Sequence, residues 1–211
     1  MTLYELRPQD GIGPFRLGMT RTEAEAVRRE LGLPPPPESF YLEYEGDRLS
    51  RIGLNRSDED RIIYDGMDLM QTHAETVLAA LRQKAAMECD CEDPDLAWTC
   101  YFPNLGLELW REEPYHPKLL SQPGFQQFIR QDPCHWQENL SDLQRGWCFE
   151  QVWVEDTYFR TAFPLEIHPA PDYSTSKTEP PMAAPTPEEM ALLIKKYRLE
   201  PPEQSGRGDR T

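Results

Sequence analysis

Cysteine and histidine are the side chains of this sequence best suited to nucleophilic or metal chemistry, with five of the first and four of the second. Thiolates and imidazoles together could bind zinc. Zinc knuckles, however, need two cysteines roughly two to four residues apart, and Cys89 and Cys91 have only one residue between them. We therefore interpret the cysteines as small, buried apolar side chains and expect no metal. They are Cys89, Cys91, Cys100, Cys134 (followed by His135) and Cys148.

The four histidines lie in no recognisable catalytic motif. The histidines are His73, His116, His135 and His168, and none belongs to a metalloprotease helix motif. The sequence has no nucleophile elbow, phosphate-binding loop or dinucleotide fingerprint. A triad assembled in space stays open, because triads are defined by geometry and not by sequence order. We expect a non-catalytic protein without a cofactor, and an enzyme using the cysteines or histidines ranks third among the hypotheses.

An acidic segment alternates with two of the cysteines, and on a strand its carboxylates lie opposite the sulfurs. A solvated surface is the usual role of such a charge run. The segment is also the best candidate to contact a basic partner, and two tryptophans nearby could act as aromatic anchors. Calcium is disfavoured because the glycine and ligand order of a calcium loop are missing. The predicted partner-binding residues are Glu88, Asp90, Glu92, Asp93, Asp95, Trp98 and Trp110.

The formal net charge of the 211 residues is −15. Residues 1–170 hold 30 acids against 16 bases, so most of the excess belongs to this part. Such a charge repels phosphate backbones, and we expect no nucleic-acid partner. It attracts a basic protein and accelerates the encounter. The alternative is that the charge serves only solubility.

The start of the chain and the cysteine count predict the compartment. No basic start followed by an apolar stretch and a cleavage site is present. No run approaches the roughly 20 apolar residues of a membrane span. An odd number of cysteines fits reduced thiols in the cytosol. We expect a cytoplasmic protein that does not bind membranes.

The first half of the chain predicts two helices and a hairpin. Thr20 and Glu23 have the spacing of a capping box, and the helix they begin should end at Gly32. Residues 40–44 and 49–54 predict a hairpin, and residues 61–64 a third strand. A second helix is expected from about 72 to 84.

The two helices share a pattern, and each leads into strands. A meander is predicted over residues 87–91, 98–102 and 105–110, a short helix over 125–130, and strands over 147–154 and 158–167. We predict an α+β fold, with an antiparallel sheet packed against two helices and built from two degenerate helix-plus-hairpin units.

The composition changes near residue 169. We expect one domain over residues 1–168 and, after it, a proline-rich linker over the first part of 169–211. One helix is expected there at about 187–199, with Thr186 as its cap, and a disordered end follows.

Three segments carry a resemblance to known proteins: Gly11 to Thr20, Tyr64 to Leu69 and Phe102 to Arg111. They resemble a group of small bacterial proteins, some of which look like immunity proteins of polymorphic toxin systems. The paired helix-and-hairpin units are similar to those of the β-lactamase inhibitor protein and of a small lipoprotein of outer-membrane barrel assembly. The resemblance covers about residues 10–160, and its motifs are turns, a cap and a strand.

Charge, missing catalytic motifs and the resemblance lead to one hypothesis. We expect an immunity protein that binds and neutralises a cognate, basic toxin without catalysis. The alternative is an adaptor or a small-ligand-binding module with a pocket between helices and sheet.

Overall fold

The computed structural model describes residues 1–33, 40–130, 141–143, 145–156 and 165–171. The chain divides into two compact units, residues 1–114 with 146–170, and residues 115–145 with 171–211. The sequence predicts that residues 115–145 lie within one domain over 1–168, whereas this division assigns them to the second unit. The helix expected at 187–199 and most of the strand expected at 158–167 fall outside the described residues, and residues 165–167 are not a strand.

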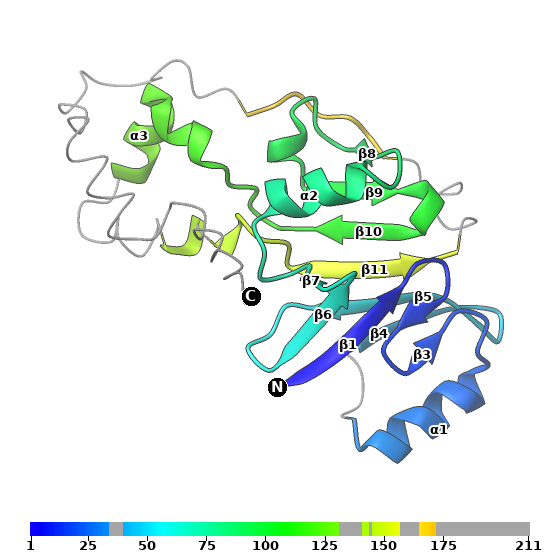
Figure 1. The fold of residues 1–211 in the computed structure, drawn as a ribbon. Helices are drawn as coiled ribbons and strands as arrows, with labels where there is room; N and C mark the ends of the chain where they lie inside the picture. The colour runs from blue at the N-terminus through cyan, green and yellow to red at the C-terminus, as the bar shows by residue number, and fades with distance from the viewer. Residues whose placement is uncertain (34–39, 131–140, 144, 157–164, 172–211) are drawn as a thin grey trace, which may run out of the picture. The chain divides into compact units, whose positions relative to one another are not determined.

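A six-stranded antiparallel sheet is the larger element of the first unit (Figure 1). The sheet confirms the α+β class, the predicted hairpin and the predicted meander. The strand predicted over residues 147–154 begins only at residue 151. Short 3-10 turns, η1 (Pro94–Leu96) and η2 (Pro103–Leu105), connect the strands of the meander. The strands in spatial order are β4 (Phe40–Glu45), β5 (Arg48–Asn55), β11 (Gln151–Glu155), β10 (Leu107–Trp110), β9 (Thr99–Phe102) and β8 (Glu88–Cys89).

A second, five-stranded sheet was not predicted. Its strands in order are β3 (Phe15–Arg16), β2 (Gly11–Ile12), β1 (Thr2–Arg7), β6 (Asp60–Tyr64) and β7 (Met67–Asp68). The predicted third strand, β6, pairs here in parallel with β1 instead of extending the hairpin. The two sheets meet at Phe40, whose ring lies 4.9 Å from those of both Tyr4 and Phe15, edge to face.

Two helices of the first unit differ in how they begin. α1 (Arg21–Leu31) has the predicted capping box: the Thr20 hydroxyl accepts from the Glu23 amide, and the Glu23 carboxylate accepts from the Thr20 amide. It ends at Gly32, whose φ of 62° is left-handed. α2 (Ala74–Arg82) is shorter than predicted, and its cap, His73, makes no side-chain capping bond. The arrangement in two repeated helix-plus-hairpin units stays a prediction.

In the second unit, α3 (Pro123–Arg130) confirms the short predicted helix and follows η3 (Pro117–Ser121). The rings of Tyr115 and Phe125 lie 6.2 Å apart, and both side chains are buried. Throughout the described part of the chain, no helix has the length and apolar character needed to cross a membrane.

Candidate functional site

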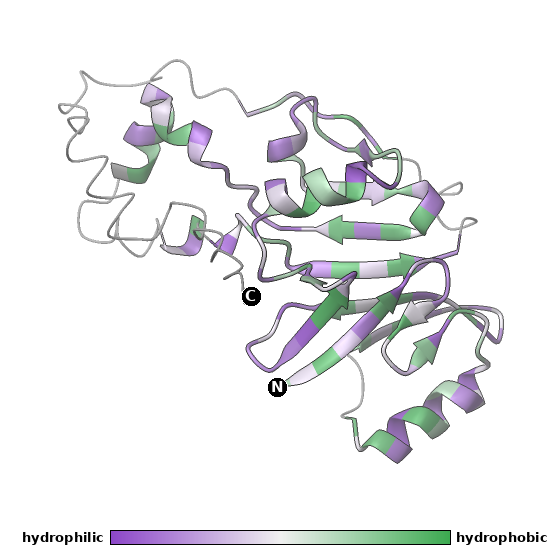
Figure 2. Ribbon diagram, in the orientation of Figure 1, coloured by the Kyte–Doolittle hydropathy of each residue, from purple (hydrophilic) through white to green (hydrophobic). Residues whose placement is uncertain are grey.

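The six-stranded sheet has two faces of opposite chemistry. Neighbouring residues of a strand point to opposite faces, so the register assigns each side chain to one of them. Apolar and polar residues alternate along β10 and β11 (Figure 2). The apolar face is part of the core: its side chains, all 0–1% exposed, are Phe40, Ile52, Leu54, Cys100, Phe102, Leu107, Leu109, Val152 and Val154.

The other face, which we call the polar face, combines aromatic, amide and charged side chains. The register sets Trp153 beside Glu108, and Glu108 beside Tyr101, in one row across the strands. A second row joins Glu43, Arg51 and Glu155. The polar face consists of Tyr41, Glu43, Arg51, Asn55, Glu88, Thr99, Tyr101, Glu108, Trp110, Gln151, Trp153 and Glu155.

Arg51 organises the charges at the centre of the polar face. Its Nε donates to Glu155 at 2.9 Å, and one Nη donates to Glu108 at 2.8 Å. The other Nη lies 3.6 Å from a carboxylate oxygen of Glu43. A guanidinium presents donors in a fixed planar fork, which allows one arginine to hold several carboxylates at set positions. Arg51, Glu108 and Glu155 are all buried, so the cluster keeps three ionisable groups in a region of low dielectric.

Glu155 carries the clearest electrostatic signature of this cluster. Burial raises the pKa of its carboxyl above the ordinary value, because the charged form loses hydration. Arg51 and a hydrogen bond from Tyr101 oppose this rise without cancelling it. The carboxyl therefore holds its proton to a higher pH than an exposed glutamate does.

Trp153 is the aromatic centre of the polar face. The Arg51 guanidinium lies 3.9 Å above its ring, a cation–π contact, and the Tyr41 ring is 5.5 Å away. Its indole nitrogen donates to Gln151. The ring covers Gly53, where an added Cβ would come within 2.4 Å of it. Glycine at this position therefore allows the tryptophan to lie flat beside the arginine.

The structure separates the partner-binding residues that the sequence predicted. Glu88, exposed, and Trp110, half-buried, lie on the polar face. Trp98 precedes β9 and is half-buried. Its backbone carbonyl accepts from the Arg111 amide, so Trp98 and Arg111 form the pair next to Thr99 and Trp110. Alternation therefore directs Trp98 to the apolar face, away from Trp110.

The remaining carboxylates of the predicted set divide between local structure and solvent. Asp90 is buried, and its carboxylate accepts from the amides of Trp98 and Thr99 at 3.0 and 2.9 Å. Asp93 caps η1 by accepting from the Asp95 amide. Asp95 is half-buried, and its backbone carbonyl accepts from a guanidinium nitrogen of Arg111. Glu92 is exposed beside the edge of the sheet. Of the acidic segment, Glu88 and Glu92 are the exposed carboxylates.

Sequence reasoning missed the residues at the centre of the polar face. Glu108 stands between leucines in Leu107-Glu108-Leu109, and Glu155 follows Val154, so both look like surface charges beside a core strand. The alternation of these strands could have indicated the face. The ion cluster could not have been found in this way, because Arg51 is more than fifty residues distant from either glutamate.

Cys91 and Cys100 are buried, as interpreted, whereas Cys89 and Cys148 are half-buried. Burial raises the pKa of the Cys100 thiol to about 12 and that of Cys148 to about 11. Cys134 is outside the described residues. Among the residues that are described, no group of three or more His, Cys, Asp or Glu side chains could hold a metal ion.

Nearby, Arg111 is buried and donates to the backbone carbonyls of Asp95, Ala97 and Gly146 at 2.6 to 3.1 Å. Burial lowers the pKa of its guanidinium. These bonds connect the turn before β9 to residue 146, so the role of the arginine is structural.

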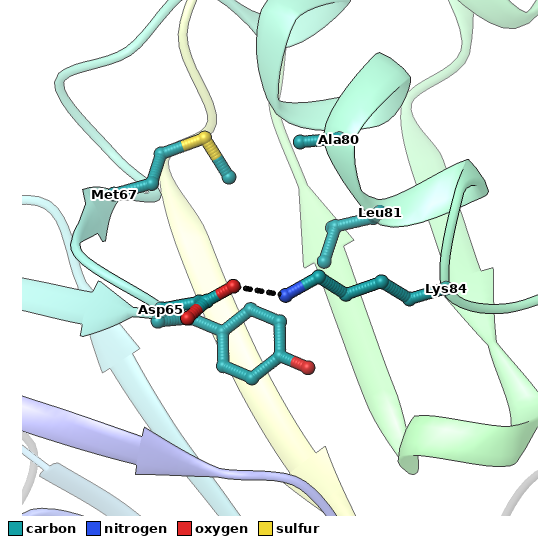
Figure 3. Close-up of a pocket in the computed structure, with 6 residues that line it drawn as sticks. Asp65, Met67, Ala80, Leu81 and Lys84 are labelled. Atoms are coloured by element: carbon teal, nitrogen blue, oxygen red, sulfur yellow. Dashed lines mark hydrogen bonds and ion pairs between the residues drawn. The ribbon is translucent and has the colours of Figure 1, made fainter.

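A small cavity of about 90 Å³ opens between the β6–β7 turn and α2 (Figure 3). It is lined by Tyr64, Asp65, Met67, Ala80, Leu81 and Lys84. Lys84 pairs with Asp65 and lies 4.7 Å from the Tyr64 ring. Ligand sites usually measure about 300 Å³ or more, so this cavity is too small for a typical organic ligand.

The class defined by these features is an α+β protein of two sheets, one of which has an aromatic and acidic face. The chain matches no protein-family model, and no similar protein was found among curated proteins or solved structures.

Proposed function

We propose that this chain is an immunity-type inhibitor, which binds and neutralises a basic protein toxin without performing catalysis. The observation that carries the proposal is the polar face of the six-stranded sheet. It combines aromatic side chains with carboxylates. Its central side chains, among them Trp153 and Glu155, are themselves buried, so the contacts it offers lie around that centre. Aromatic residues are enriched in protein interfaces, and complementary charge sets orientation and encounter rate.

The buried cluster gives this surface a fixed shape. Arg51, held by Glu108 and Glu155, fixes the Trp153 ring, and Trp153 in turn contacts Tyr41. Rigid side chains lose little conformational entropy on binding, which favours affinity. Around this centre, the half-buried Tyr41 and Trp110 and the exposed Glu43 and Glu88 supply accessible contacts.

Charge supports a basic protein as the partner. The net charge of −15 disfavours phosphate backbones and attracts cationic surfaces over distances of about 10 Å in moderate salt. The cavity beside α2 is itself too small for the alternative of a small-ligand module to be placed there.

The test combines capture with charge reversal. Tagged protein from the native host's cells is used to capture partners at low and high salt, and a captured basic protein is then expressed with and without this chain. The proposal predicts stoichiometric binding that weakens as salt rises, and rescue of the cells from that protein's toxicity.

Two double variants with the same change in net charge separate contact from long-range attraction. Glu88→Lys with Glu92→Lys alters the polar edge near β8, and Glu25→Lys with Glu30→Lys alters exposed positions on α1. We expect the first to weaken binding by about tenfold or more and the second by much less, since electrostatic contacts act locally once a complex forms. Equal effects of the two variants, or no basic partner at low salt, would refute the proposal.

A further inference from the structure

Cys89 and Cys100 face each other on neighbouring strands at the edge of the six-stranded sheet. The register pairs Cys89 of β8 with Cys100 of β9. The next pair along, Asp90 and Thr99, carries the backbone hydrogen bond, from the Asp90 amide to the Thr99 carbonyl at 3.2 Å. Hydrogen-bonded and non-hydrogen-bonded pairs alternate in antiparallel sheets, so Cys89 and Cys100 form a non-hydrogen-bonded pair.

This type of pair has the spacing that a disulfide needs. Directly opposed residues of a non-hydrogen-bonded pair have Cα atoms about 4.5 Å apart. Disulfides join residues whose Cα atoms are roughly 4.4 to 6.8 Å apart. Both side chains leave the sheet on the same face, because opposed residues of paired strands share a face. Bond formation therefore requires side-chain rotation and little movement of the backbone.

The surroundings give the two thiols different access to solvent. Cys89 is half-buried, and its Sγ donates to the Cys91 carbonyl at 3.2 Å. Cys100 is fully buried, so a dissolved oxidant cannot reach it directly. Burial also raises the pKa of its thiol, which keeps it in the less reactive protonated form. The sulfur of Cys89 is the neighbour through which Cys100 can be oxidised.

We propose that Cys89 and Cys100 form a reversible cross-strand disulfide when the protein meets a peroxide. The Cys89 thiolate attacks one oxygen of hydrogen peroxide, and the O–O bond breaks to give a sulfenic acid and, after protonation, water. The Cys100 sulfur then attacks the sulfenic sulfur; its proton and the departing hydroxide leave as a second water. Two thiols lose two electrons and two protons in total, and one peroxide is reduced to two waters. A cellular thiol reverses the reaction by exchange.

The bond would fasten the shortest strand of the sheet to its neighbour. β8 has only two residues, and the chain returns to β9 through residues 90–98. A cross-link over this short loop stabilises the fold chiefly by restricting the unfolded chain. The same loop contains Glu92, so oxidation would also hold one of the exposed carboxylates in place.

The experiment treats the full-length protein with hydrogen peroxide and counts free thiols after denaturation. We expect the count to fall from five to three per chain and to return to five with dithiothreitol. A protease that cleaves before aspartate cuts at Asp90, between Cys89 and Cys91, and at Asp93 and Asp95, between Cys91 and Cys100. Mass spectrometry of the unreduced digest should then find the peptide of Cys89 joined to that of Cys100.

Variants supply the controls. Cys91→Ser should still lose two thiols, whereas Cys89→Ser should keep Cys100 reduced. The unfolding temperature should rise by several degrees on oxidation of the wild type and remain unchanged for Cys89→Ser. Cys89→Ser decides the test without a replacement of the buried Cys100. A bond from Cys89 to Cys91, a bond between two chains, or oxidation of Cys89 beyond the sulfenic acid without a bond would overturn the proposal.

Discussion

At the residue scale, Arg51 is the side chain on which most of the polar face depends. It contacts two buried carboxylates and one tryptophan ring. A buried ion pair contributes little compared with an apolar replacement of the whole pair, yet removing a single partner leaves charge buried without compensation. The stability of the polar face therefore depends on the cluster being complete.

Replacing the arginine tests this dependence. Arg51→Met should lower the free energy of unfolding by about 3–5 kcal/mol, because Glu108 and Glu155 lose their shared cation. Urea unfolding followed by tryptophan fluorescence measures the change. Lys84→Met is the matched control: it removes the cation of an exposed pair with Asp65, and exposed pairs contribute little. A small effect of Arg51→Met, similar to that of the control, would contradict this account.

The raised pKa of Glu155 predicts a pH dependence. Between the ordinary glutamate value of 4.5 and the raised value, the folded protein holds a proton that the unfolded chain has released. Stability contributed by this group is therefore full below 4.5 and is lost as the pH rises through that window. Glu155→Gln cannot titrate, so the wild type should lose stability relative to it with rising pH. Parallel curves of unfolding free energy against pH would show that the carboxyl is not perturbed.

At the scale of elements, the caps of the two helices give the sharpest contrast. Thr20 and Glu23 satisfy each other's amides at the start of α1, while the first turn of α2 relies on other contacts. His73 stacks on Trp147 with ring centroids 3.6 Å apart, and the Trp147 indole nitrogen donates to Glu75. The start of α2 is thus fixed by packing, and that of α1 by its own sequence.

A substitution in the cap of α1 should show this local control. Thr20→Ala is expected to reduce the free energy of unfolding by about 1 kcal/mol, since the amide of Glu23 loses its acceptor. Thr22→Ala, an exposed position inside the same helix, should have no destabilising effect. Chemical denaturation of both variants gives the comparison, and equal losses would argue against the capping box.

These elements also show what the sequence could predict. The capping box, the hairpin of β4 and β5 and the order of the meander follow from local spacing, because turns and caps act over a few residues. The parallel pairing of β1 with β6 did not follow: it joins Tyr4 to Ile62 across more than fifty residues. Nothing in either segment selects that partner over an adjacent strand.

From residue type alone, the candidate site was predictable only at its edge. Glu88 and Trp110 could be selected by residue type, and the register sets both on the polar face. Asp90 and Trp98 were grouped with them because the sequence does not reveal that Asp90 bonds to backbone amides. Loop geometry, which determines where such side chains point, depends on tertiary contacts such as those of Arg111.

At the scale of the whole molecule, the net charge of −15 acts against folding through repulsion among the surface carboxylates. Added sodium chloride should therefore raise the unfolding temperature, because ions screen exposed charges more effectively than buried ones. Thermal unfolding at about 10 mM and 500 mM salt measures the shift. The Glu25→Lys, Glu30→Lys variant carries less negative charge and should respond less. A temperature that falls with salt would show that attractive pairs dominate the surface.

The edges of the six-stranded sheet also determine how copies of this chain behave when crowded together. β4 has acidic side chains at Glu43 and Glu45, and β8 stops after two residues. Beyond β8, the backbone of His168 bonds to Asp90 and Glu92. Charged, short or covered edges give an incoming strand no regular row of partners. This sheet should thus resist edge-to-edge polymerisation into filaments.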